Sequence, residues 1–274
     1  MKKLLLAAIA SGITMASFAQ TDTTATERAD TIKIGGMIII KKPGKDGKED
    51  KEVIISNRHG RRNNSNVSTN WGIVDLGFAN YNDKTNYGSA ETRAFAPGIN
   101  NKDQLKLRNI KSVNVNIWFF MQRLNVVKHV VNLKYGLGLE LNNYRFDDES
   151  IHFHKNPTLI TSDYTGVSKN KLAADYVTVP MMVNFNFTPN KRKGFGLSAG
   201  MSAGYLYSSR QKIKGDDGKH KLHDDFDLRS WKLSYIGELN LGPVKLYGSY
   251  ALKSMWEKGL DQTPYNVGIR LNSW

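Results

Sequence analysis

Two clusters that combine histidine with acidic residues are the segments of this sequence whose residue types could do chemistry. His152 and His154 are separated by one residue and follow the acidic stretch 147–149, and on a strand this spacing turns both rings to one face. Imidazole and carboxylate groups together can hold a divalent ion. Exposed loops have the same composition for solubility alone, so we assign no metal and no cofactor to either cluster. The second cluster consists of His220 and His223 with Asp216, Asp217, Asp224 and Asp225.

The motifs of the common catalytic classes are missing from the sequence. It has no G-x-S-x-G, no H-E-x-x-H and no phosphate-binding loop, and it has no cysteine. The absence of cysteine excludes disulfides, thiolate metal sites and a cysteine nucleophile. We therefore predict no catalytic residue and do not expect an enzyme, although an enzyme or receptor acting through its loops stays open as an alternative.

The segments around these clusters alternate between large apolar residues and small or polar ones. In 131–146 the leucines and tyrosines alternate with Lys134, Gly136, Gly138 and Glu140. A period of two residues predicts a β-strand, and no segment predicts a helix. Eight segments share the pattern: 71–81, 113–121, 131–146, 177–187, 195–208, 231–241, 244–252 and 265–271.

The connections between these segments alternate in length. Outer-membrane barrels have short turns at the periplasmic rim and long loops at the outer rim, and their strand number is even. We therefore expect an all-β fold, an antiparallel up-and-down transmembrane β-barrel of about eight strands, with ten as the alternative. The long connections are 82–112, 147–175, 209–230 and 253–264, and the short ones are 122–130, 188–194 and 241–243.

Alternate residues of a strand point to opposite faces, and the two resulting sets, which we call phases, differ in chemistry. This difference indicates which phase faces lipid. One phase is apolar, whereas the other consists of glycine, serine and asparagine with few charges. A thin and nearly balanced set of charges suits a narrow lumen in which each charge has a partner, and not the outside of a soluble barrel. The predicted lumen charges are Asp75, Lys134, Glu140, Lys232, Glu238, Lys245 and Arg270.

Aromatic residues near the strand ends predict two interfacial belts, because tyrosine and tryptophan favour the boundary between lipid and water. Within the strand 177–187, Pro180 cannot donate a ladder hydrogen bond, so we expect a bulge or bend there. The belt at the short-turn rim is predicted to contain Trp71, Phe119, Phe185, Phe187 and Phe195. The belt at the long-loop rim is predicted to contain Tyr144, Tyr176, Tyr205, Tyr207, Trp231, Tyr250 and Tyr265.

Residues 1–19 have the features of a secretory signal peptide. Two lysines precede an apolar stretch, and the small-x-small site Ser17-Phe18-Ala19 stands before Gln20. We expect cleavage there and export to the cell outer membrane. Residues 20–69 are then a periplasmic extension, with a hairpin expected between the β-prone runs 32–40 and 52–56, and residues 70–274 are the barrel.

Several segments resemble a known family. DTIKIGGMIIIKK, NVSTNWGIVDLGFANYNDKTNY, YGLGLELNNYRFDDE and DYVTVPMMVNFNF are similar to the outer-membrane β-barrel proteins of Bacteroidota, the PorT-like group often labelled porin-family. The resemblance covers nearly the whole chain after residue 19 and implies a barrel of eight to ten strands without an established activity. The C-terminus resembles the final-strand signal read by the barrel-assembly machinery, although Trp274 is out of phase with Leu271. Its residues are Tyr265, Val267, Ile269, Leu271 and Trp274.

The formal net charge of +14 indicates an anionic partner. Export and the scattered positions of the basic residues argue against nucleic acid, so we expect outer-membrane lipid and lipopolysaccharide, with the assembly machinery and an envelope protein as further partners. The expected function is a structural or interaction role in the cell envelope. A small-solute porin is the alternative, but an eight-strand barrel has an interior that side chains just fill.

Overall fold

The computed structural model describes residues 30–34, 37–43, 49–55, 65–189, 194–216 and 218–271. The chain divides into two units, Met1–Asn64 and Ser65–Trp274. The predicted signal peptide lies outside the described residues. None of the helices in the described part is long and apolar enough to cross a membrane.

The N-terminal unit contains a three-stranded antiparallel sheet in the order β1-β2-β3. Its strands are β1 (Asp30–Ile34), β2 (Met37–Pro43) and β3 (Glu49–Ile55). The sequence predicted a two-stranded hairpin here. The β-prone run 32–40 instead contributes to two strands, which pair with each other before β2 pairs with β3.

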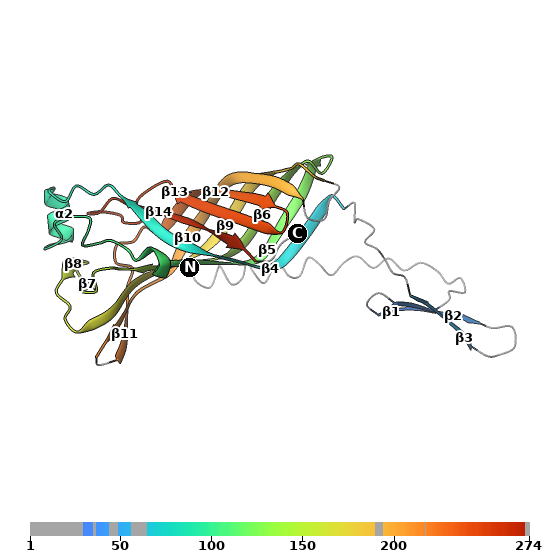
Figure 1. Ribbon diagram of the computed structural model, residues 1–274, viewed down its shortest axis with the longest axis horizontal. Coiled ribbons are helices and arrows are strands. Elements are labelled where there is room, and N and C mark those ends of the chain that lie inside the picture. Colours follow the sequence, from blue (N-terminus) through green and yellow to red (C-terminus); the bar gives the residue numbers. More distant parts are fainter. Residues whose placement is uncertain are drawn as a thin grey trace. The chain divides into compact units, whose positions relative to one another are not determined.

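The second unit is a closed ring of eight antiparallel strands, as the sequence predicted (Figure 1). Each strand pairs with its neighbour along the chain, and β14 closes the ring by pairing with β4. The segments whose residues alternate with a period of two thus form strands, as the sequence predicted. The barrel strands are β4 (Val67–Asp83), β5 (Val113–Val127), β6 (Val131–Arg145), β9 (Val167–Asn186), β10 (Phe195–Gly215), β12 (Trp231–Leu241), β13 (Val244–Ala251) and β14 (Gln262–Arg270).

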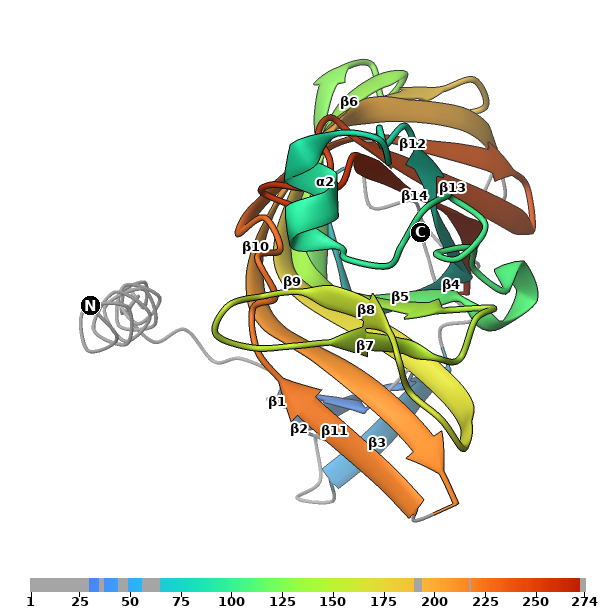
Figure 2. The ribbon, with the colours of Figure 1, turned by 90° about the vertical axis from the view of Figure 1, so that its left-hand side faces the viewer.

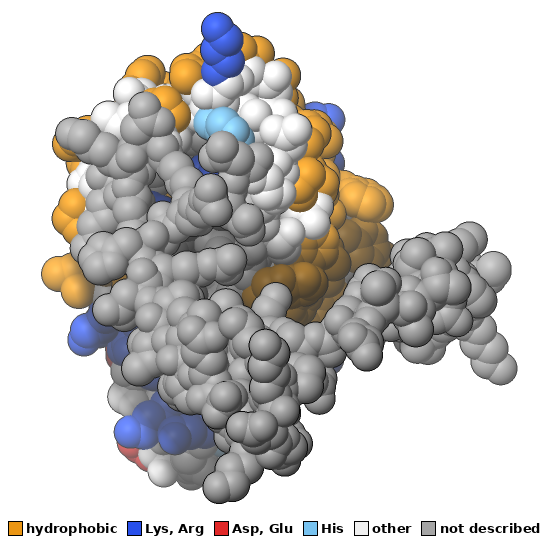
Figure 3. Space-filling model, turned by 90° about the vertical axis from the view of Figure 1, so that its right-hand side faces the viewer, with side chains coloured by type: hydrophobic (Ala, Val, Ile, Leu, Met, Phe, Trp, Pro, Cys, Tyr) orange, Lys and Arg blue, Asp and Glu red, His pale blue; other side chains and the backbone are white. Residues whose placement is uncertain are grey.

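The outer wall of the barrel is apolar (Figure 3). On β9, Val177, Val179, Met181, Val183 and Phe185 are exposed, while the residues between them are buried. Ten residues of strand, tilted by about 40°, span about 25 Å along the barrel axis, which matches the apolar band of outer-membrane barrels. The exposed phase of the strands therefore faces lipid, and the buried phase faces the lumen.

Two of the aromatic residues predicted for the outer belt lie elsewhere. Tyr144 and Tyr176 are 1% and 2% exposed and belong to the interior. Both stand in the lumen-facing phase of their strands, so their position near a strand end does not bring them to the lipid boundary. Tyr205, Tyr207 and Trp231 are exposed, as a belt requires.

Of the bulge or bend predicted at Pro180, the bulge is not found. Pro180 pairs with Ser202 in unbroken register, and the ladder to β6 keeps one register from Met181 to Thr178. A missing N–H group interrupts a ladder, whereas a bulge needs an extra residue. The register instead shifts at Phe119 and Val126 in β5, and at Tyr207 and between Lys214 and Gly215 in β10.

The long connections fold into short elements over one end of the barrel (Figure 2). The sequence predicted no helix, and the six-residue α2 is too short to show a helical period. It begins at Ser89, whose hydroxyl accepts a hydrogen bond from the backbone N–H of Thr92. The elements are α2 (Ala90–Phe95), η2 (Asn109–Lys111), β7 (Ile151–Phe153), β8 (Ile160–Ser162) and β11 (Gly218–His223).

Candidate functional site

The structure brings most of the predicted lumen charges into the interior of the barrel. Alternation along four strands turns them inward, and their side chains or whole residues are at most 8% exposed. Lys245 differs, since it is only partly buried near the short-turn rim. The charges inside the lumen are Asp75, Lys134, Glu140, Lys232, Glu238 and Arg270.

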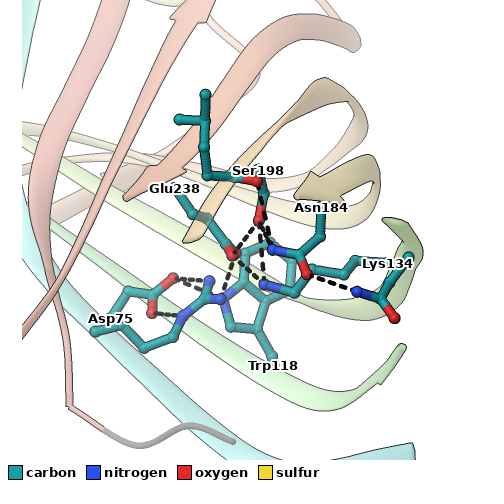
Figure 4. A network of polar contacts seen from close by, with 9 residues as sticks. Asp75, Trp118, Lys134, Asn184, Ser198 and Glu238 are labelled. Atoms are coloured by element: carbon teal, nitrogen blue, oxygen red, sulfur yellow. Dashed lines mark hydrogen bonds and ion pairs between the residues drawn. The ribbon is translucent and has the colours of Figure 1, made fainter. Parts of the chain in front are cut away.

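The first group of these charges contains Asp75, Lys134 and Glu238 (Figure 4), and Arg270 joins them. Its Nε lies 2.6 Å from Asp75 Oδ1 and its Nη2 lies 2.9 Å from Asp75 Oδ2, which is a bidentate pair. Its Nη1 donates to Glu238, and the ammonium of Lys134 pairs with the same Glu238. Two cations and two carboxylates therefore share one continuous network across the lumen.

Glu140 and Lys232 form the second group. They pair directly, and the Lys232 ammonium also lies 5.0 Å from the centre of the Tyr176 ring. The carboxylate of Glu140 accepts further hydrogen bonds from Asn142 at 3.1 Å and Asn266 at 3.0 Å. With three acids and three bases in the two groups, the six buried charges balance.

Neutral side chains that the sequence analysis did not single out complete the network. Trp118 donates its indole N–H to Asp75 at 2.7 Å, and Ser198 donates to Glu238 at 3.3 Å. Asn184 donates to Ser198 at 3.0 Å, and Asn132 donates to Asn184 at 3.2 Å. All of these residues stand in the same strand phase as the charges. This shared phase is the feature of the sequence by which they could have been predicted to face the lumen.

Little space remains between these side chains. The cavity between the two charged groups has a volume of about 30 Å³ and is lined by residues including Asp75, Glu140 and Arg270. Such a volume holds one or two water molecules. Beside it, Ile73, Trp118, Met121 and Met182 form an apolar cluster.

The long-loop end of the barrel is closed by a second, apolar core, which we call the cap. Phe95, Phe153, Phe226 and Trp256 come from four different connections and are each at most 4% exposed. The rings of Phe153 and Trp256 are stacked with centroids 6.0 Å apart, and Phe95 meets Trp256 edge-on at 5.8 Å. Contacts of this kind between separate loops make the cap a packed structure.

Hydrogen bonds between loops hold the cap together. Thr92 donates its hydroxyl to the carbonyl of Gly259 at 2.6 Å, and Arg229 donates to the carbonyl of Trp256 at 3.0 Å. Gln211 on β10 donates to the carbonyl of Ile151 at 2.8 Å. The first two bonds join pairs of loops, and the third ties a loop to the barrel wall.

The cluster of His152 on β7 and His154 just after this strand assembles with an acid that the sequence did not indicate. His152 Nδ1 lies 3.0 Å from Asp163 Oδ1, and His154 Nε2 lies 3.7 Å from Asp163 Oδ2. Burial and then His154 lower the pKa of His152, whereas hydrogen bonds from Thr161 and His152 lower the pKa of Asp163 against the effect of burial. His220 and His223 lie on β11, and among the described residues they belong to no group of three possible metal ligands.

Six lysines form two rows on the outer face of the sheet where β9 and β10 extend beyond the ring. Residues directly opposite on neighbouring strands point to one side, so the like charges of each row are adjacent. Burial and then neighbouring cations lower the pKa of Lys171 and Lys212. The rows are Lys171, Lys212 and Lys221, and Lys169, Lys214 and Lys219.

The comparison with protein families agrees with this architecture. The model described as outer membrane protein beta-barrel domain matches residues 61–255. The chain belongs to this family. Among solved structures it is similar to Ail, the attachment invasion locus protein of Yersinia pestis, with 12% identity, a TM-score of 0.32, and coverage of 73% of this chain and 97% of that one. Curated proteins give no match.

Membership of the outer membrane protein beta-barrel family places the protein in the outer membrane. The apolar outer wall then lies in lipid, and the cap lies at the long-loop rim. The final strand of this barrel presents Val267, Ile269 and Leu271 on the lipid face, 45–59% exposed, with Tyr265 half-buried in the same phase. Trp274 lies outside the described residues.

Proposed function

We propose that this outer membrane protein is a non-conducting barrel with a structural or interaction role, which presents its cap at the cell surface. The observation that carries the proposal is the double closure of the barrel, by the paired charges in the lumen and by the apolar cap at one end. The proposal includes no catalysis.

The closure disfavours the porin alternative for two reasons. A cavity of about 30 Å³ between Asp75, Glu140 and Arg270 leaves no room for a water column of ion width. An ion entering there would also have to separate charges that already pair, such as Lys134 with Glu238. In a solute channel the lumen charges would line open water instead.

We predict that the purified protein shows no stable single-channel steps in planar bilayers. Heat-modifiable migration of the same sample verifies that the barrel is folded. The variant Trp256→Ala, which loosens the cap, should stay silent as well, because the charge network below it is intact. Large and steady conductance from the unmodified protein would replace this proposal with the porin function.

The finer assignments belong to the same proposal. We infer that residues 1–19 are a cleaved signal peptide, and that the final strand is read by the barrel-assembly machinery through Tyr265, Val267, Ile269 and Leu271. We also propose a protein partner in the envelope. The β1–β3 sheet of the N-terminal unit is a second surface on which such a partner could dock.

Lipopolysaccharide is the lipid partner that we propose, and the two lysine rows are the contact. Among the described residues, none of these six lysines forms an ion pair. Like charges directly opposite each other destabilise a sheet, and an external anion would offset this. Lys171 is six residues beyond Val177 on β9, so its row stands about 15 Å above the apolar band, among the phosphates and sugars of the outer leaflet.

We predict that lipid A raises the melting temperature of the protein in detergent micelles, and that the triple variant Lys171→Gln, Lys212→Gln, Lys221→Gln loses most of this increase. Salt should weaken the effect in the unmodified protein, because the contact is between charges near water. The matched control replaces Lys84, Lys102 and Lys111, which are exposed loop lysines, with glutamine. Equal responses of the two triple variants would show that net charge, and not the rows, attracts the lipid.

A further inference from the structure

We propose that His152, His154 and Asp163 form a Zn²⁺ site on the outer side of the cap. The three residues offer two imidazole nitrogens and one carboxylate oxygen, and these donor atoms lie within 4.8 Å of one another. Two histidines and one carboxylate are a ligand set that zinc uses in proteins. The site is separate from the lumen network and from the lysine rows.

The distances between the donor atoms are close to those that a zinc ion requires. Tetrahedral zinc with bonds of about 2.1 Å holds its ligand atoms about 3.4 Å apart. The distance from His152 Nδ1 to Asp163 Oδ1 is 3.0 Å, and His154 Nε2 lies 3.7 Å from the other oxygen of the same carboxylate, Oδ2. The three donor atoms lie within 4.8 Å of one another, so no separation exceeds the tetrahedral value by more than about 1.4 Å, which small side-chain rotations can close.

The scaffold under these side chains is fixed by the cap core. Ile151 and Phe153 on β7 alternate along the chain with His152 and with His154, which directly follows the strand. Both are fully buried, as is Ile160 on the paired strand β8. His154 donates its backbone N–H to the carbonyl of Leu159 at 2.8 Å, which tightens the turn of this hairpin. The two rings are therefore held side by side, with centroids 3.8 Å apart, by packing on the opposite face.

The donor atoms are also accessible. The side chains of His152, His154 and Asp163 are 23%, 33% and 54% exposed, so an ion can reach them from solution. Thr161, whose hydroxyl lies 2.7 Å from His154 Nε2, would give up this contact to the metal.

The nature of the donors selects the ion. Imidazole nitrogen suits zinc and other transition metals, whereas Mg²⁺ and Ca²⁺ require mostly oxygen ligands. Three protein ligands leave a fourth position for water. We therefore expect binding of Zn²⁺ at pH 7.5 and no saturable binding of Mg²⁺ or Ca²⁺ at this place.

The experiment is isothermal titration of the full-length protein, in detergent micelles, with ZnCl₂. One equivalent should bind, and His152→Gln together with His154→Gln should weaken its affinity at least tenfold. Lowering the pH to 5.5 should weaken binding in the unmodified protein, because protons compete for the imidazole nitrogens. Heat-modifiable migration and the melting temperature of each variant verify its fold.

Two matched controls keep the interpretation specific. His220→Gln with His223→Gln removes the other histidine pair, and His129→Gln removes the histidine of the β5–β6 turn, and both should bind zinc like the unmodified protein. Loss of binding in a control that remains folded would place the metal elsewhere. An unmodified protein that takes up no zinc, or a doubly substituted His152 and His154 variant that binds it equally well, would overturn the site.

Discussion

Replacing Glu238 with glutamine is expected to lower the free energy of unfolding by about 3–5 kcal/mol, which is the usual effect of removing one partner from a buried ion pair. Glu238 is the common partner of Lys134 and Arg270, and all three side chains are at most 6% exposed. Glutamine keeps the shape of the side chain but removes the charge. Lys134 and Arg270 then stay buried with one negative charge fewer to balance them. Urea titration of the protein in lipid bilayers measures the change.

Glu257→Gln is the matched control, because this carboxylate stands exposed in the loop after β13. Its effect on the free energy of unfolding should stay within about 0.5 kcal/mol. The double variant Glu238→Gln, Lys134→Gln should recover part of the loss, since the buried charges then balance again. If Glu238→Gln and Glu257→Gln have equal effects, the lumen network does not stabilise the barrel.

The barrel and its lumen could be predicted because both follow from the period of a strand. Once Leu133 and Leu139 are placed toward lipid, Lys134 and Glu140 have to point inward, whatever the rest of the chain does. A prediction fails when it uses the distance of a residue from the strand end and ignores the phase of that residue. Tyr144 and Tyr176 were predicted for a belt because they are near strand ends, yet their even spacing from Lys134 and Thr178 marks them as interior residues.

The cap could not be predicted because its contacts are long-range and have no period. Phe95, Phe153, Phe226 and Trp256 are isolated aromatic residues within polar loops, and nothing in the sequence pairs one with another. The zinc ligands show the same limit. His152 and His154 follow from their spacing, but the acid nearest in sequence is not their partner, because the β7–β8 pairing brings Asp163 to them instead.

The second prediction with a large expected effect concerns the cap. Trp256→Ala should lower the free energy of cap opening by about 3–5 kcal/mol, because truncation of a buried tryptophan leaves a cavity. It removes the stacking on Phe153 and the hydrogen bond of 2.8 Å from its indole N–H to Gln262. Trypsin added to intact cells should then cleave rapidly after exposed loop residues such as Lys155, while heat-modifiable migration shows that the barrel remains folded.

Trp231→Ala is the control for this experiment, because Trp231 is 61% exposed in the lipid-facing belt and has no part in the cap core. Cleavage of this variant should match that of the unmodified protein. Cleavage at Lys155 only after cell lysis would reverse the proposed topology, since the long-loop rim would then face the periplasm. Rapid cleavage of the unmodified protein would show instead that the connections are open loops at the cell surface, and the closure of the barrel would depend on the lumen charges alone.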